Sequence, residues 1–129
     1  MKRILSALFI LLGFHSFAFS QALPASSLWK NQRGSTLEVF FVDPAGSFQG
    51  QFINRAAGFT CQGTPFPAVG TVKNTSIAFS VSFVPCASYA TWYGLVNGNT
   101  MKTPLIILFV PPKGPPLKVH ETDVFTRVR

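Results

Sequence analysis

The chain has 129 residues, which is enough for one domain with a modest hydrophobic core. Its 11 basic residues outnumber its 4 acidic residues, which gives a formal net charge of +7. Because the nine basic residues after residue 20 stand singly along the sequence, they do not form the basic patch expected of a nucleic-acid-binding protein. Residues 1–20 begin with a basic stretch, continue with an apolar run too short to span a bilayer, and end in small side chains before Gln21. This layout predicts a secretory signal peptide, and therefore a single domain at residues 21–129 that is secreted or periplasmic rather than membrane-bound.

The rest of the sequence predicts strands rather than helices. Short runs rich in β-branched and aromatic residues recur between Gly, Pro, Asn and Asp, and no stretch has a convincing helical apolar period. Apolar and polar side chains alternate most clearly in residues 75–83, while residues 105–110 are continuously apolar, as in a strand covered on both faces. In chain order, the predicted strands are a short one around Trp29 and then residues 36–42, 48–54, 66–72, 75–83, 90–96, 105–110 and 119–128.

This succession of strands predicts an all-β fold, an eight-stranded antiparallel up-and-down β-barrel. Closing the sheet removes exposed strand edges, and a barrel of this size can hold one small ligand. The first and last strands of such a barrel are neighbours, so residues 29–35 and 123–129 can meet at the lining of one cavity. The sequence therefore predicts a ligand-binding barrel.

The two cysteines, Cys61 and Cys86, belong to a chain that we expect to be exported, and an oxidising compartment favours their pairing. A disulfide between them would close a loop of about 25 residues and stabilise the fold by roughly 3 kcal/mol on the chain-entropy estimate. No histidine stands near either cysteine, so neither a zinc site nor an activated thiolate is indicated. The sequence also has no plausible Ser-His-acid set and no carboxylate pair with a catalytic spacing, so we predict neither a metal site nor an enzyme.

Several short motifs resemble the avidin and streptavidin family of biotin-binding proteins. The opening pattern of the family is present as Trp29, Asn31 and Gly34-Ser35. Other patterns of the family occur at residues 46–52 and 123–127, and patterns more similar to its dimeric rhizavidin-like branch occur at residues 54–61, 65–67 and 77–81.

The resemblance implies an avidin-like barrel that binds biotin without catalysis and without a cofactor. Asn31 and Ser35 would donate hydrogen bonds to the ureido oxygen, while Asp123 and Asn54 would accept from the two ureido N–H groups. Residues 55–57 would lie over the acidic tail in a loop secured by the disulfide, which lowers the ordering cost of binding. The implied biotin-binding residues are Asn31, Ser35, Phe52, Asn54, Phe83, Ser88, Trp92, Leu105 and Asp123.

Four positions depart from the family pattern. Phe52 stands where the family usually has a tyrosine that donates to the ureido oxygen, and Ala90 stands where it has a threonine. Phe83 and Leu105 replace tryptophans. A lost hydrogen bond costs about 0.5–1.5 kcal/mol, and each smaller wall gives up contact area. We therefore expect weaker biotin binding than in streptavidin.

Two other functions remain open from the sequence. One is a lipocalin-like barrel that binds another small apolar ligand, and the other is a structural or interaction barrel with a degenerate pocket. Retention of Asn31, Ser35, Asn54 and Asp123 argues against the second, because a degenerate pocket has no use for that polar set. The expected partners are biotin or biotinylated molecules and a second copy of the chain, since the resemblance favours a homodimer formed through residues 105–110, with a higher oligomer as the alternative.

Overall fold

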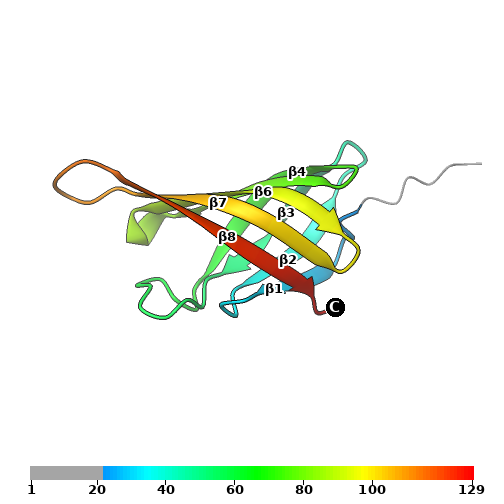
Figure 1. The fold of residues 1–129 in the computed structure, drawn as a ribbon, viewed down its shortest axis with the longest axis horizontal. Helices are drawn as coiled ribbons and strands as arrows, with labels where there is room; N and C mark the ends of the chain where they lie inside the picture. Colours follow the sequence, from blue (N-terminus) through cyan, green and yellow to red (C-terminus); the bar gives the residue numbers. More distant parts are fainter. Residues whose placement is uncertain (1–21) are drawn as a thin grey trace, which may run out of the picture.

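Antiparallel strands close into one barrel in the computed structural model, which describes residues 22–129 (Figure 1). The predicted signal peptide, residues 1–20, lies outside the described residues. Between residues 22 and 129, no helix has the length and apolar character needed to cross a membrane. The elements are β1 (Ser27–Asn31), β2 (Thr36–Val42), β3 (Ser47–Ile53), β4 (Pro65–Lys73), β5 (Ser76–Phe83), the 3-10 helix η1 (Val84–Cys86), β6 (Ser88–Asn97), β7 (Thr100–Phe109) and β8 (Leu117–Arg127).

Each strand pairs with the next one along the chain, and β1 pairs back with β8. This last pairing sets Trp29 opposite Arg127 and Asn31 opposite Phe125. The hairpin of β7 and β8 reaches beyond the other strands at one end of the barrel (Figure 1). The prediction of an eight-stranded up-and-down barrel is confirmed.

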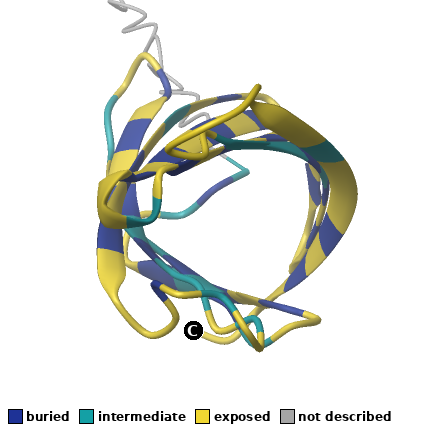
Figure 2. Ribbon diagram, turned by 90° about the vertical axis from the view of Figure 1, so that its left-hand side faces the viewer, coloured by how far each residue is buried: buried dark blue, intermediate teal, exposed yellow. Residues whose placement is uncertain are grey.

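Burial alternates along the strands, as expected for a sheet with one inner face. In β5 the buried side chains are Ile77, Phe79, Val81 and Phe83, and the serine and alanine residues between them are exposed. The end-on view shows the same bands of buried and exposed residues around the ring (Figure 2). Alternate residues of each strand therefore reach the interior, where a cavity can be lined.

The observed strands agree closely with the predicted ones except at β7. This strand begins at Thr100, whereas the prediction began it at Leu105. Its pairing with β6 lapses between Leu105 and Lys102, where Pro104 has no N–H to offer. The apolar run also divides between two faces. Leu105 is buried inside the barrel, whereas Ile106 pairs with the exposed Thr91 on the outer surface and is partly buried.

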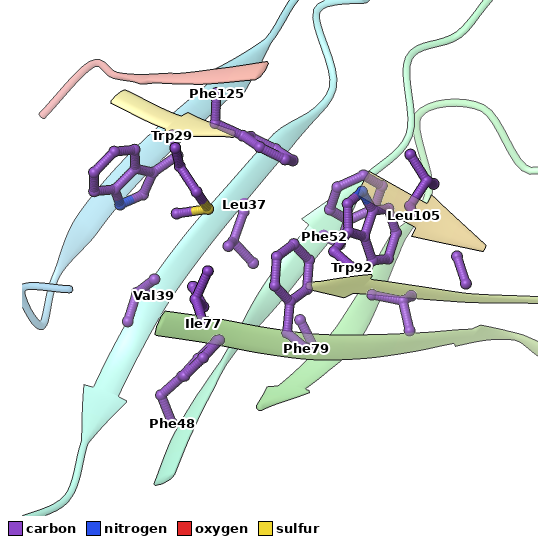
Figure 3. Close-up of a cluster of buried hydrophobic side chains, with 14 of the residues drawn as sticks. Trp29, Leu37, Val39, Phe48, Phe52, Ile77, Phe79, Trp92, Leu105 and Phe125 are labelled. Carbon is purple, nitrogen blue, oxygen red and sulfur yellow. The ribbon is translucent and has the colours of Figure 1, made fainter. Parts of the chain in front are cut away.

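Large apolar side chains fill the barrel from one end. Trp29 and Phe125 gather at one end of the cluster and Trp92 lies toward the other, with Phe79 between them (Figure 3). Trp29 is fully buried and donates its indole N–H to Ser27 Oγ at 2.9 Å. Phe79 stacks on Trp92 with 4.7 Å between ring centroids and 8° between ring planes. This packing closes one end of the barrel and forms the floor of a cavity at the other.

Candidate ligand-binding site

A cavity of about 600 Å³ lies at the end of the barrel marked by Trp92 and Leu105. Its volume is in the range of small-molecule sites. Every residue that the sequence resemblance assigned to biotin binding lines this cavity, although these residues come from distant parts of the chain. They are Asn31, Ser35, Phe52, Asn54, Phe83, Ser88, Trp92, Leu105 and Asp123.

The turn between β1 and β2 offers two hydrogen-bond donors to the cavity. Asn31 Oδ1 accepts the backbone N–H groups of Arg33 at 3.0 Å and Ser35 at 2.9 Å. Because both bonds need an oxygen at that position, the amide NH₂ group is left for a ligand. Ser35 Oγ accepts the backbone N–H of Arg55 at 2.9 Å, which leaves its hydroxyl hydrogen to donate. Both side chains are buried, so their remaining donors are directed toward the cavity that they line rather than toward bulk water.

Asp123 is a buried carboxylate with three hydrogen-bond donors around it. Trp92 Nε1 donates to Oδ2 at 2.8 Å. Gln32 Nε2 donates to Oδ1 at 3.1 Å, and Arg33 Nη1 donates to the same oxygen at 2.5 Å. These bonds offset the cost of burying a charge. A carboxylate oxygen can accept two hydrogen bonds, so Oδ2 keeps the capacity for a second donor.

The loop between β3 and β4 forms another wall of the cavity. Asn54 anchors it, because its Oδ1 accepts the backbone N–H of Ala56 at 2.8 Å and its backbone carbonyl accepts that of Gly63 at 2.8 Å. The ring of Phe59 in this loop meets the ring of Phe83 edge-on, with 5.2 Å between centroids. The loop is therefore attached to the barrel by hydrogen bonds and by aromatic packing.

The predicted disulfide between Cys61 and Cys86 is confirmed, with 6.2 Å between the two Cα atoms. Cys61 belongs to the β3–β4 loop and Cys86 to η1, the connection between β5 and β6. The bond spans a sequence separation of 25. It therefore ties the cavity-lining loop covalently to the neighbouring β5–β6 connection.

Buried aromatic rings form the apolar part of the cavity wall. Phe52 lies 4.7 Å from Trp92 and 6.0 Å from Phe83 between ring centroids. Leu105 and Ala90 continue the wall, and both are buried. The four positions that depart from the family pattern all line this cavity.

The cavity also contains residues that sequence reasoning did not assign to the site. Glu121 precedes Asp123 by two residues, and Ile107 and Phe109 continue the face of Leu105 at the same spacing. Strand alternation therefore carried the signal that could have identified them. Arg33 and Phe59 have no such periodic signal, because they lie in the β1–β2 turn and in the β3–β4 loop. The full set is Arg33, Phe59, Ile107, Phe109 and Glu121.

Comparison with known proteins places this site in a family. The model of the avidin family matches residues 19–109, which is more than half of the chain. The chain belongs to the avidin family. The matched segment ends before β8 and does not include Asp123. Asp123 nevertheless lines the same cavity, because β8 pairs with β1 in the closed barrel.

Two avidin-family relatives show the extent of the similarity. Afifavidin from Afifella pfennigii is 41% identical over 76 residues, which cover 56% of this chain and 47% of afifavidin. Hoefavidin from Hoeflea phototrophica is 29% identical over 121 residues, which cover 82% of this chain and 74% of hoefavidin. The chain thus aligns with about half the length of the first relative and about three quarters of the second.

Two avidin-family structures extend the comparison to complexes with biotin. The bradavidin2–biotin complex is 44% identical with a TM-score of 0.78, covering 83% of this chain and 100% of that one. The rhizavidin–biotin complex is 39% identical with a TM-score of 0.73, covering 82% of this chain and 93% of that one. Both are structures of the same barrel with biotin bound.

Proposed function

We propose that this protein binds biotin, without catalysis and without a cofactor, in the cavity at the open end of the barrel. The observation that carries the proposal is the convergence of Asn31, Ser35, Asn54 and Asp123 on one cavity from three separate segments: the β1–β2 turn, the end of β3 and β8. A cyclic urea has one acceptor oxygen and two N–H donors, and it needs complementary groups in one small space. The biotin complexes of bradavidin2 and rhizavidin, which share the fold and more than a third of the sequence, support the same ligand.

The donor side of the site suits the ureido oxygen. The NH₂ group of Asn31 and the hydroxyl of Ser35 are left as donors because the acceptor atoms of both side chains are occupied by backbone N–H groups. Fixed donors lose little freedom when a ligand binds, so their bonds contribute more of their strength to affinity.

The acceptor side suits the ureido N–H groups. Asp123 Oδ2 accepts from Trp92 and can accept a second donor, and Asn54 Oδ1 accepts from Ala56 with one lone pair remaining. A hydrogen bond to a carboxylate is roughly twice as strong as a neutral one. We therefore assign the strongest single polar contact with biotin to Asp123.

The apolar wall suits the thioether ring, and the β3–β4 loop suits the acidic tail. Phe52, Phe83, Trp92 and Leu105 would enclose the ring, with Ser88 near the tail. We expect an affinity below that of streptavidin, because Phe52 provides no hydroxyl and the walls at Phe83 and Leu105 are smaller than tryptophan.

The outer face of β6 and β7 is suited to contact with a second copy of the chain. Tyr89 and Tyr93 on β6 are 46% and 47% exposed, and the neighbouring Ile106 and Leu108 on β7 are partly buried. Large apolar side chains gathered on the outer face of neighbouring strands are typical of an interface. We propose a homodimer packed through this face, and a protein that acts after secretion.

Retention on immobilised biotin, with release by free biotin, tests the function, and calorimetry gives the affinity. We expect specific retention and an affinity weaker than that of streptavidin measured side by side. Failure of the folded protein to bind either form of biotin would remove the proposal. Light scattering of the protein and of Ile106→Lys tests the assembly, with a dimer expected for the first and a monomer for the second.

A further inference from the structure

Arg33 is a cavity-lining arginine for which the proposed recognition of biotin has no use. It belongs to the turn between β1 and β2 that also carries Asn31 and Ser35. Its backbone N–H donates to Asn31 Oδ1 at 3.0 Å, and the next N–H, from Gly34, donates to the Asn31 carbonyl at 3.0 Å. Gly34 has a φ of +82°, which glycine adopts without strain. The backbone that carries Arg33 is thus fixed by the same bonds that position the two donors.

The guanidinium of Arg33 spans two carboxylates on β8. Nη1 lies 2.5 Å from Asp123 Oδ1, and Nη2 lies 2.8 Å from Glu121 Oε2. The side chain of Asp123 is 2% exposed, whereas those of Arg33 and Glu121 are 35% and 37% exposed. The contact with Asp123 is therefore the less screened of the two and the more important for the site.

This contact weakens the main acceptor of the cavity. Arg33 forms a charge-assisted hydrogen bond with Oδ1, while the ureido N–H is expected at Oδ2, so the guanidinium acts on the ligand's acceptor through the charge that the two oxygens share. Because the positive charge of Arg33 compensates the carboxylate in the empty cavity, Asp123 attracts a further donor less strongly than a free carboxylate would. A cationic donor meets an additional penalty, because it must approach the positive charge already present.

Glu121 acts in the opposite direction. It shares the guanidinium with Asp123, so it draws positive charge away from the acceptor that the ligand uses. The strength of Asp123 as a hydrogen-bond acceptor therefore depends on how strongly Arg33 pairs with Asp123 and how strongly it pairs with Glu121.

We propose that Arg33 determines the selectivity of this cavity. By neutralising Asp123 it lowers the affinity for a cyclic urea, and it lowers the affinity for a cyclic guanidinium still further. The proposal rests on the biotin-binding function proposed above, and it adds that the ion pair, as well as the smaller aromatic wall, keeps that binding weak.

The test compares two ligands by calorimetry at neutral pH: biotin and its analogue with NH in place of the ureido oxygen, a cyclic guanidinium. Arg33→Gln should bind biotin about tenfold more tightly than the original protein, the change given by about 1.4 kcal/mol. The same substitution should improve binding of the cyclic guanidinium by a larger factor than it improves biotin. Lys30→Gln is the matched control, because it removes one positive charge from the outer face of β1, where Lys30 has no contact with Asp123, and it should change neither affinity.

Glu121→Gln tests the role of the second carboxylate, because it removes the negative charge of Glu121 and nearly keeps the size of the side chain. It frees the guanidinium to pair with Asp123 alone, so it should weaken biotin binding when Arg33 is present and have no effect in the Arg33→Gln background. Arg33→Lys keeps the charge but cannot span both carboxylates with a planar fork, and its affinity should lie between those of the original and Arg33→Gln. Thermal unfolding without ligand establishes that each variant is folded.

The outcomes distinguish this proposal from the function on which it rests. If the original protein binds biotin and folded Arg33→Gln and Arg33→Lys bind it no more tightly, Arg33 is not a selectivity determinant. Equal gains for biotin and the cyclic guanidinium would also overturn the proposal. If the original protein and every folded variant fail to bind biotin, the function itself is wrong and this proposal fails with it. Binding by Arg33→Gln alone would support it in its strongest form.

Discussion

The two ends of the barrel use neighbouring residues of the same strands for opposite purposes. On β1, Trp29 belongs to the closed apolar end, and Asn31, two residues further on, lines the cavity. On β8, Phe125 belongs to the closed end (Figure 3). Asp123, two residues before it, lines the cavity. A step of two residues is about 7 Å along a strand and keeps the side chain on the same face. The barrel therefore changes from core to binding site within one step of strand alternation.

This difference indicates that stability and binding depend on separable sets of side chains. At the closed end, apolar packing supplies stability and touches no ligand. At the open end, the acceptor atoms of the buried polar side chains take hydrogen bonds from backbone and side-chain donors, and within residues 22–129 no side-chain nitrogen or oxygen that is completely shielded from solvent lacks a partner. Substitutions at the two ends should accordingly change different measured quantities.

Met101→Ala should have the largest effect on stability. Met101 is fully buried beside Phe125 at the closed end, and removing such a side chain costs about 2–5 kcal/mol of unfolding free energy through lost burial and the remaining cavity. Denaturant titration measures this loss, and calorimetry should find biotin affinity little changed. Met101→Leu, which keeps the volume, is the control and should cost less than about 1.5 kcal/mol. A fall in affinity as large as the fall in stability would contradict the separation of the two ends.

Replacing both Cys61 and Cys86 with serine should come next. We expect a loss of about 3 kcal/mol of unfolding free energy on the chain-entropy estimate. Unlike Met101→Ala, this change should also weaken biotin binding, because the loop that the disulfide secures lines the cavity. Denaturant titration and calorimetry measure the two effects. The original protein under reducing conditions is a control that alters no side chain, and it should behave in the same way.

The sequence predicted the strands of the barrel and the polar residues of its cavity for different reasons. Alternation in residues 75–83 identified β5 because inner and outer faces differ strongly there in polarity. The polar set of the cavity came from short motifs, two at the ends of the domain and one that begins at Asn54, and the meeting of the first two depends on the pairing of β1 with β8. Both kinds of signal are local in the sequence or depend only on barrel topology.

The missed features depend on contacts that no local pattern encodes. Three of the first four residues of β7 are polar and the strand continues through Pro104, so propensity argued against a strand that pairing with β8 nevertheless stabilises. The contact of Arg33 with Asp123 joins residues separated by 90 positions. The two side chains meet because closure of the barrel brings the β1–β2 turn next to β8. A local sequence pattern does not show which side chains will meet in this way.

Asp123→Ala should have the largest effect on binding. It removes the proposed acceptor of a ureido N–H and leaves the Trp92 indole N–H without its partner, so affinity should fall by about 1.5–3 kcal/mol, up to roughly a hundredfold. Asp123→Asn keeps the shape and one oxygen but loses the charge, and it should fall between the alanine variant and the original. Calorimetry with free biotin measures all three. Unchanged binding by the alanine variant would mean that the carboxylate does not contact the ligand.

Phe52→Tyr should have the smallest effect and the opposite sign. Phe52 is 1% exposed and lines the cavity next to Trp92, so we expect a hydroxyl added to its ring to reach the ligand. As a third donor to the ureido oxygen, it should strengthen biotin binding by about 0.5–1.5 kcal/mol. Phe79→Tyr is the matched control, because that ring is buried against Trp92 outside the cavity lining, where a hydroxyl would reduce stability without improving affinity. A gain in affinity for the first variant and a loss of stability for the second would place the boundary between binding site and core at the ring of Trp92. The same change in biotin affinity and in stability for both variants would mean that the ring of Trp92 does not separate the binding site from the core.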